Sequence, residues 1–256
     1  MNTDTLLPAG EPPLVALINV TKRYDTATVL QEVNLEIRER EFVALIGPSG
    51  CGKSTLLRII AGLIAPSSGQ VLCGGRPVDG LNPATAMVFQ SFALLPWLRA
   101  AENVALPLEA REVPLPDRLR RAEHYLDLVG LKGHGRAFPK ELSGGMKQRV
   151  GLARALCQEP RILLMDEPFS SLDVLTAKTL RDQVLDLWQS PEIPTKTILL
   201  VTHSIEEAVY MADRVVALRA DPGTVAAEFV ISAARPRRPT APDVREIVDE
   251  LYAVMV

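Results

Sequence analysis

Residues 47–54 form a glycine-rich loop that fits the phosphate-binding pattern G-x-x-x-x-G-K-[ST]. Backbone N–H groups can approach a polyphosphate only where side chains do not block them, which explains the glycines. The lysine supplies a mobile positive charge for the β- and γ-phosphates, and the hydroxyl after it is a ligand for Mg²⁺. A strand-like apolar run precedes the loop, and an amphipathic helix pattern follows it, so the positive end of that helix would face the phosphates. The chain is predicted to bind a nucleoside triphosphate through Gly47, Pro48, Ser49, Gly50, Cys51, Gly52, Lys53, Ser54 and Thr55.

Composition limits what else the chain can be. Its 256 residues are 47% hydrophobic, which suffices for one large domain or two coupled subdomains. A net charge of −3 gives no overall attraction to nucleic acid, so we expect no nucleic-acid partner. Three cysteines without C-x-x-C spacing argue for a reducing compartment and against a zinc site. No apolar run reaches the roughly 18 residues of a membrane span, and no signal peptide is evident, so we expect contact with a membrane only through a partner.

Apolar runs and helical patterns divide the chain into regions. Runs at 14–20, 33–37, 41–46, 86–89, 162–165 and 197–201 predict strands, and the later ones are typical of parallel strands buried on both faces. Between them, helical patterns at 117–129 and 145–158 predict a helical subdomain over about 91–158. We expect a polar tail over 1–13, an α/β nucleotide-binding domain over 14–230, and a linker with an amphipathic helix over 231–256. The basic, proline-broken stretch 235–239 is expected to be a solvated connector rather than a binding patch.

Two adjacent carboxylates, Asp166 and Glu167, follow the apolar run 162–165. In a phosphate-loop protein, a carboxylate at the tip of a neighbouring strand completes the Mg²⁺ shell, which is the role expected of Asp166. Successive strand residues face opposite ways, so Glu167 is free to polarise a water aimed at the γ-phosphate. The alternative is an ordinary acidic strand end. The pair therefore favours hydrolysis over transfer of the phosphoryl group to a substrate.

A second anion-binding helix start is predicted at Leu142-Ser143-Gly144-Gly145. Ser143 can cap the helix that begins beside it, and the two glycines leave backbone N–H groups bare. Taken alone, this pattern could be a simple helix cap. Together with the phosphate loop and the paired carboxylates, it identifies a family.

From about residue 14 to 230 the chain resembles the ATP-binding cassette ATPases, whose motifs occur here in order. Tyr24 matches the aromatic residue that stacks on adenine, residues 47–54 match the phosphate loop, and Gln90 matches the glutamine of the Q-loop. Residues 142–145 match the signature, and Asp166 and Glu167 match the end of the Walker B strand. Residues 171–173 match the D-loop, and His203 matches the switch histidine. The resemblance implies a P-loop NTPase core of the α/β class, with an antiparallel β subdomain and an inserted α-helical subdomain.

The resemblance also implies a mechanism. Two copies of the chain would close head to tail over two ATP molecules, each held by the phosphate loop of one copy. The signature of the other copy would complete each site, with Ser143, Gly144, Gly145 and the D-loop residue Asp173 acting across the interface. Glu167 would be the general base, His203 would hold the γ-phosphate and water, and Gln90 would contact Mg²⁺ with Ser54 and Asp166. Met146 departs from the glutamine of the most familiar signature, at a side chain that is not a phosphate donor.

Details after Gln90 narrow the resemblance to one branch. Leu94-Leu95-Pro96-Trp97, Met146 and Ala212-Asp213-Arg214-Val215 are similar to the import ATPases for nitrate, sulfonate, taurine and related solutes. The segment 92–98 is apolar and proline-broken, and such a segment can receive a short helix from a membrane partner, unless it simply packs the helical insert. The implied partners are multi-span permease subunits and, indirectly, a solute-binding protein. The implied location is peripheral, at the cytoplasmic face of the inner membrane.

Two other classes are weighed against the importer. A soluble cassette ATPase of the cluster-assembly type also has a single cassette, so length does not exclude it, and only the 94–97 segment argues against it. A phosphate-loop kinase or GTPase is disfavoured because the chain has no Asn-Lys-x-Asp motif and carries 142–145 instead. The transported solute is chosen by other subunits, so this sequence does not name it.

Overall fold

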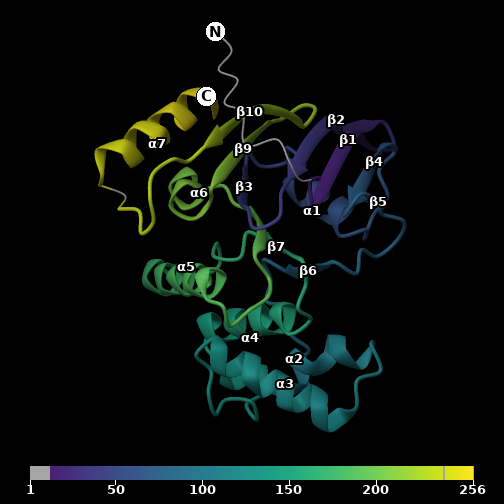
Figure 1. Cartoon of the computed structure of the whole chain (residues 1–256), viewed down its shortest axis with the longest axis vertical. Coiled ribbons are helices and arrows are strands. Elements are labelled where there is room, and N and C mark those ends of the chain that lie inside the picture. Colours follow the sequence, from purple (N-terminus) through teal and green to yellow (C-terminus); the bar gives the residue numbers. More distant parts are fainter. Residues whose placement is uncertain (1–11, 239, 256) are drawn as a thin grey trace.

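The computed structural model describes residues 12–238 and 240–255. Two β-sheets lie toward one end of the molecule, and the helices α2 (Ala100–Glu109), α3 (Leu115–Leu128) and α4 (Gly144–Leu156) gather at the other (Figure 1). The helix α7 (Pro242–Met255) lies on the flank of the strands (Figure 1). The smaller sheet is antiparallel, in the order β2-β1-β4-β5. Its strands are β1 (Val15–Tyr24), β2 (Ala27–Ile37), β4 (Ser68–Cys73) and β5 (Arg76–Pro77). This sheet is the antiparallel subdomain that the family resemblance implies.

The larger sheet has the order β10-β9-β3-β8-β7-β6 and is parallel apart from its β9–β10 edge. Its strands are β3 (Phe42–Ile46), β6 (Thr85–Val88), β7 (Ile162–Asp166), β8 (Thr197–Val201), β9 (Arg214–Arg219) and β10 (Thr224–Val230). Because β3, β6, β7 and β8 are parallel, their carboxyl ends meet at one edge of the sheet. The residues that follow those four strands are therefore brought close together.

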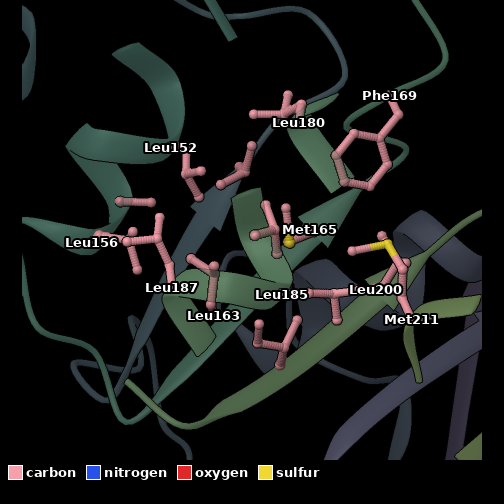
Figure 2. Close-up of a cluster of buried hydrophobic side chains, with 14 of the residues drawn as sticks. Leu152, Leu156, Leu163, Met165, Phe169, Leu180, Leu185, Leu187, Leu200 and Met211 are labelled. Atoms are coloured by element: carbon pink, nitrogen blue, oxygen red, sulfur yellow. The ribbon is translucent and has the colours of Figure 1, made fainter. Parts of the chain in front are cut away.

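Burial on both faces explains why the central strands are continuous apolar runs. In β3, Phe42, Ala44 and Ile46 point into one buried cluster, whereas Val43 and Leu45 point into a second cluster on the other face. Figure 2 shows part of the first cluster, where leucines of α4 and of α5 (Val174–Gln189) pack against β7. The sheet is thus a rigid platform for whatever its edge carries.

The helices cover the sheets and build the helical end. They are α1 (Lys53–Ile60), α2 (Ala100–Glu109), α3 (Leu115–Leu128), the 3₁₀ turn η1 (Pro139–Glu141), α4 (Gly144–Leu156), α5 (Val174–Gln189), α6 (Ile205–Met211) and α7 (Pro242–Met255). Within the described ranges, every helix is too short or too polar to cross a membrane. The helices predicted at 117–129 and 145–158 are confirmed as α3 and α4, to within two residues at each end.

The expectation of a solvated connector before the last helix was wrong. Arg237 is 4% exposed, and its guanidinium donates to the carbonyls of Val209, Ala212, Ile231 and Ala233. Arg235 forms an ion pair with Asp213 and lies over the ring of Trp188. The sequence of this basic, proline-containing stretch gives no sign of burial. Arg237 is buried because the last carbonyls of α6 have no hydrogen-bond donor within the helix and accept from the guanidinium instead. The helix that follows packs Val244 and Leu251 into the first cluster.

The predicted strands are present, but the set was incomplete. The run 33–37 is only the second half of β2, and β4, β5, β9 and β10 were not predicted. Strand β4 has the burial pattern of a half-exposed surface strand, with three exposed residues at its start, so its sequence carries little hydrophobic signal. Its position depends on pairing with β1, which is a tertiary contact.

Candidate nucleotide-binding and catalytic site

The phosphate loop follows β3, and its crest is open. Pro48, Ser49 and Gly50 are exposed, and a Cβ on Gly50 would meet no atom within 4 Å. Gly52 has a φ of 97°, and a Cβ there would lie 2.6 Å from Leu30. A side chain at Gly52 would therefore collide with β2 as well as strain the backbone. The loop has the bare backbone that an anion needs, directly before the N-terminus of α1.

Lys53 is buried against the loop that precedes it. Its Nζ donates to the carbonyl oxygens of Gly47 at 2.8 Å and Pro48 at 2.9 Å, and only 6% of the residue is exposed. Cys51 is 1% exposed, with its Sγ 3.9 Å from the same ammonium. Burial raises the pKa of the Cys51 thiol, and the nearby Lys53 only partly offsets that effect. Cys51 is thus a neutral packing residue within the loop.

A hydroxyl and a carboxylate meet beside the loop. Asp166, at the end of β7, accepts a 2.8 Å hydrogen bond on Oδ1 from the Ser54 hydroxyl at the start of α1. Burial raises the pKa of Asp166, and the Ser54 hydrogen bond acts in the opposite direction. Oxygen ligands from two elements, beside a phosphate loop, are a donor set that suits Mg²⁺ bound together with a triphosphate. Ser54 and Asp166, two of the three residues predicted to hold the metal, therefore fit it, and Gln90 lies two residues after the neighbouring strand β6.

Glu167 is the centre of a polar chain along the sheet edge. Its Oε2 lies 3.2 Å from Nδ1 of His203, which comes two residues after β8. Its carbonyl accepts a hydrogen bond from the Ser170 hydroxyl at 3.0 Å, and that hydroxyl also accepts from Nε2 of Gln90 at 3.3 Å. Glu167 itself has a φ of 44°, which turns it away from the direction of β7. A non-glycine residue in this region is typical of functional sites.

The structure therefore brings together most of the residues predicted for hydrolysis. Ser170 links the Gln90 amide to the Glu167 carbonyl, and His203 contacts the Glu167 carboxylate directly. Asp166, the residue before Glu167, is paired with Ser54. Ser170 was not predicted. It is a small polar residue in a loop, and only the folded chain shows that it joins Gln90 to Glu167.

The signature residues lie elsewhere. Ser143 caps α4 by accepting from the N–H of Met146 at 3.3 Å, as predicted, and Ser143 and Gly144 are exposed. Figure 1 places α4 among the helices at one end and α1 beside the strands toward the other. Asp173 caps α5 in the same chain, accepting from the N–H of Thr176 at 3.0 Å, and a Cβ on Gly145 would lie 2.4 Å from Thr176. Thr176 of α5 therefore lies next to both Gly145 and Asp173.

Tyr24 ends β1 and is 45% exposed. The Nζ of Lys22 lies 5.0 Å from the centre of its ring. The ring is thus accessible, as expected of an aromatic that stacks on a base, and it already has a cation on it. The position of Lys22 beside the ring was not predicted from the sequence.

Two further residues fix the segment after Gln90, and neither was predicted. Arg154 of α4 donates to the carbonyls of Phe92 at 3.2 Å and Ala93 at 2.6 Å. Asn103 of α2 is fully buried; its amide donates to the carbonyls of Leu95 and Leu98, and its Oδ1 accepts from the N–H of Leu95. Trp97 remains 69% exposed. The segment is therefore held in shape from beneath while its tryptophan faces outward.

Comparisons with known proteins agree with this geometry. The family model described as ABC transporter matches residues 30–170. The aliphatic sulfonates import ATP-binding protein SsuB of Bacillus subtilis is 44% identical over 220 residues, which cover 86% of this chain and 84% of that protein. The nitrate import ATP-binding protein NrtD of Synechocystis is 44% identical over 207 residues, covering 81% of this chain and 77% of that protein.

A solved structure agrees as well. A dimeric ATP-binding cassette in a post-hydrolysis state with ADP and phosphate has a TM-score of 0.73 and 35% identity, covering 86% of this chain and all of that one. The family resemblance and the fold class predicted from the motifs are confirmed. The chain belongs to the ABC transporter family, as one of its ATP-hydrolysing cassette subunits.

Proposed function

We propose that this chain hydrolyses ATP to energise the import of a small solute, of the nitrate or organic sulfonate type, through a separate membrane permease. The observation that carries the catalytic part is the Glu167 carboxylate, held 3.2 Å from His203 at the edge where Gln90 and Asp166 also lie. In the proposed reaction, a water oxygen bonds to the γ-phosphorus as the bond to the bridging oxygen breaks, and Glu167 accepts the water proton. His203 orients the carboxylate and the γ-phosphate.

The phosphate loop and Lys53 bind the triphosphate in this proposal. The ammonium already sits within the loop, so it needs only to turn from the carbonyls of Gly47 and Pro48 toward the β- and γ-phosphates. Ser54 and Asp166 would hold Mg²⁺, with Gln90 contributing from the loop after β6. The metal would neutralise charge on the phosphates. Tyr24 would stack on adenine.

Two copies of the chain would be needed for each reaction. Ser143 and Gly144 are exposed at the start of α4, which lies far along the molecule from α1. A second copy, arranged head to tail, would bring its signature to this chain's phosphate loop. Two helix N-termini and Lys53 would then offset the charge of one triphosphate. Gly145 would lie at this contact, and Asp173 would reach across from the start of α5.

A groove between β6, the loop after α1, and α2 is a site for the permease. Its wall carries Leu63, Leu81 and Phe89, which are 47%, 75% and 38% exposed. Phe89 directly precedes Gln90, so a partner bound in the groove would lie close to the residue that is proposed to contact Mg²⁺. An amphipathic helix with apolar anchors is the chemistry that fits such a groove.

The solute class rests on the relatives rather than on this chain's own residues. One named relative is an aliphatic sulfonates import ATP-binding protein and the other a nitrate import ATP-binding protein, and both of these solutes are anions. A solute-binding protein would deliver the anion to the permease, and this chain would act at the cytoplasmic face of the membrane.

Affinity purification from gently solubilised native membranes tests the importer assignment. The tagged chain should recover a multi-span membrane protein together with a solute-binding protein. Leu81→Glu should abolish that recovery while ATP affinity stays unchanged. Leu115→Glu is the matched control, because Leu115 is 54% exposed at the start of α3. Recovery of cytosolic proteins only would contradict the transport role and favour a soluble cassette ATPase.

A further inference from the structure

Lys22 makes two contacts that the proposed reaction does not use. Its Nζ lies 5.0 Å from the centre of the Tyr24 ring and donates to the carbonyl oxygen of Ala65 at 2.8 Å. The first contact is a cation–π interaction, and the second is a charge-assisted hydrogen bond. One ammonium therefore joins an exposed aromatic ring to a backbone carbonyl 43 residues away.

The second contact joins Lys22 to the loop after helix α1, where Ala65 lies. Helix α1 starts at Lys53 in the phosphate loop and ends at Ile60, and Ala65 lies five residues beyond that end. Lys22 thus connects the strand that carries Tyr24 with the loop that follows the phosphate-binding helix. An ATP molecule must be held at the base and at the phosphates together, so the spacing between these two elements matters.

Neighbouring contacts stiffen the same junction. Ser67 accepts a hydrogen bond from the Arg23 N–H at 3.0 Å, and its own N–H donates to the Thr21 carbonyl at 2.7 Å. The register of β1 against β2 shifts between Lys22 and Arg23, a bulge of the kind that re-aims side chains. The backbone here is fixed on both sides of Lys22. The remaining freedom at this site is that of the Lys22 and Tyr24 side chains.

We infer that Lys22 is a positioning residue that holds the Tyr24 ring in place for the adenine base. The ammonium covers one face of the ring, which leaves the opposite face for stacking. The Tyr24 side chain is 45% exposed, so it would otherwise lose conformational entropy when a base binds. By restricting the ring beforehand, the ammonium reduces that loss. The inference rests on the proposed role of Tyr24 as the base platform.

A comparison of ATP with inorganic tripolyphosphate tests the inference, because only ATP carries a base. Lys22→Met should weaken ATP binding about two- to five-fold, the range of an exposed cation–π contact, and leave tripolyphosphate binding unchanged. Lys22→Arg keeps a cation and hydrogen-bond donors and should restore ATP affinity to within about two-fold of the original. Both ligands can be titrated by calorimetry on the full chain.

Arg23→Met is the matched control, since it removes the same charge from the adjacent, exposed position of β1. It should affect ATP and tripolyphosphate equally. Equal weakening of both ligands by Lys22→Met would mean that Lys22 acts by charge on the phosphates, and would overturn the inference.

A double-mutant cycle separates this inference from the role of Tyr24. If Lys22 acts through the ring, Lys22→Met should have no further effect on ATP binding in a Tyr24→Ala background. Additive losses would overturn the inference. If Tyr24→Ala weakens ATP binding and Lys22→Met does not, Lys22 alone is misassigned. If Tyr24→Ala leaves ATP affinity unchanged, the base platform fails and the inference about Lys22 fails with it.

Discussion

Contacts between single side chains that are far apart in the sequence stabilise two regions of this protein, the sheet edge that carries Asp166 and Glu167 and the C-terminal region. Glu167 is oriented by His203, 36 residues away, and Asp166 is paired with Ser54, 112 residues away. Arg237 acts in the same way at the end of α6, where burial lowers its pKa to about 10. The guanidinium therefore stays protonated at neutral pH and keeps all its donors.

Arg237→Met should destabilise the chain by about 2–4 kcal/mol, because buried carbonyls at the end of α6 would lose their donors. Unfolding in urea measures the change. Arg238→Met is the control, since Arg238 is exposed one position later. Equal stability of the two variants would contradict the role of Arg237 as an internal anchor.

Cys51 should react slowly with a thiol alkylating agent, although it lies in the phosphate loop. It is buried and its pKa is raised, so little thiolate is available at neutral pH. Cys73, which is only partly buried, should be alkylated first, and peptide mass spectrometry distinguishes the two. Faster labelling of Cys51 than of Cys73 would contradict this account of the loop.

At the scale of elements, parallel strand ends assemble the site, and this much could be predicted from sequence. Apolar runs at 162–165 and 197–201 located β7 and β8, and the residues after them proved to be neighbours. Ser170, Asn103 and Arg154 could not be predicted, because each acts on a segment that only tertiary packing brings near. Arg237 was misread for the same reason. The local sequence pattern identifies residues at the ends of strands and helices. It does not identify side chains that donate hydrogen bonds to the carbonyls of a distant element.

Arg154 is a donor of this kind, because it binds carbonyls of the segment after Gln90. Arg154→Met should leave ATP affinity within about two-fold and lower kcat about ten- to hundred-fold. The Phe92 and Ala93 carbonyls would lose their donors, and Gln90, two residues before Phe92, would lose its fixed position. Steady-state ATPase kinetics give both quantities. Arg149→Met on the same helix is the control, because the Arg149 guanidinium lies near Gly130 instead. An unchanged kcat in Arg154→Met would show that the segment does not depend on this anchor.

At the scale of the whole molecule, the two predicted halves of the ATP site lie at different ends. The phosphate loop, Asp166 and Glu167 gather at the sheet edge, whereas the exposed Ser143 begins a helix of the other end (Figure 1). This separation gives a physical reason for two copies to act together. The proposed mechanism depends on this pairing of two copies.

Glu167→Gln tests that claim most directly. The substitution keeps the shape of the side chain but removes the base, so hydrolysis should fall by at least about a hundredfold while ATP binding persists. With ATP and Mg²⁺, light scattering after size exclusion should show a stable species of twice the monomer mass holding two ATP molecules. Lys53→Ala should remain monomeric under the same conditions because it loses nucleotide affinity. Normal turnover by Glu167→Gln, or a monomer saturated with ATP, would contradict the account.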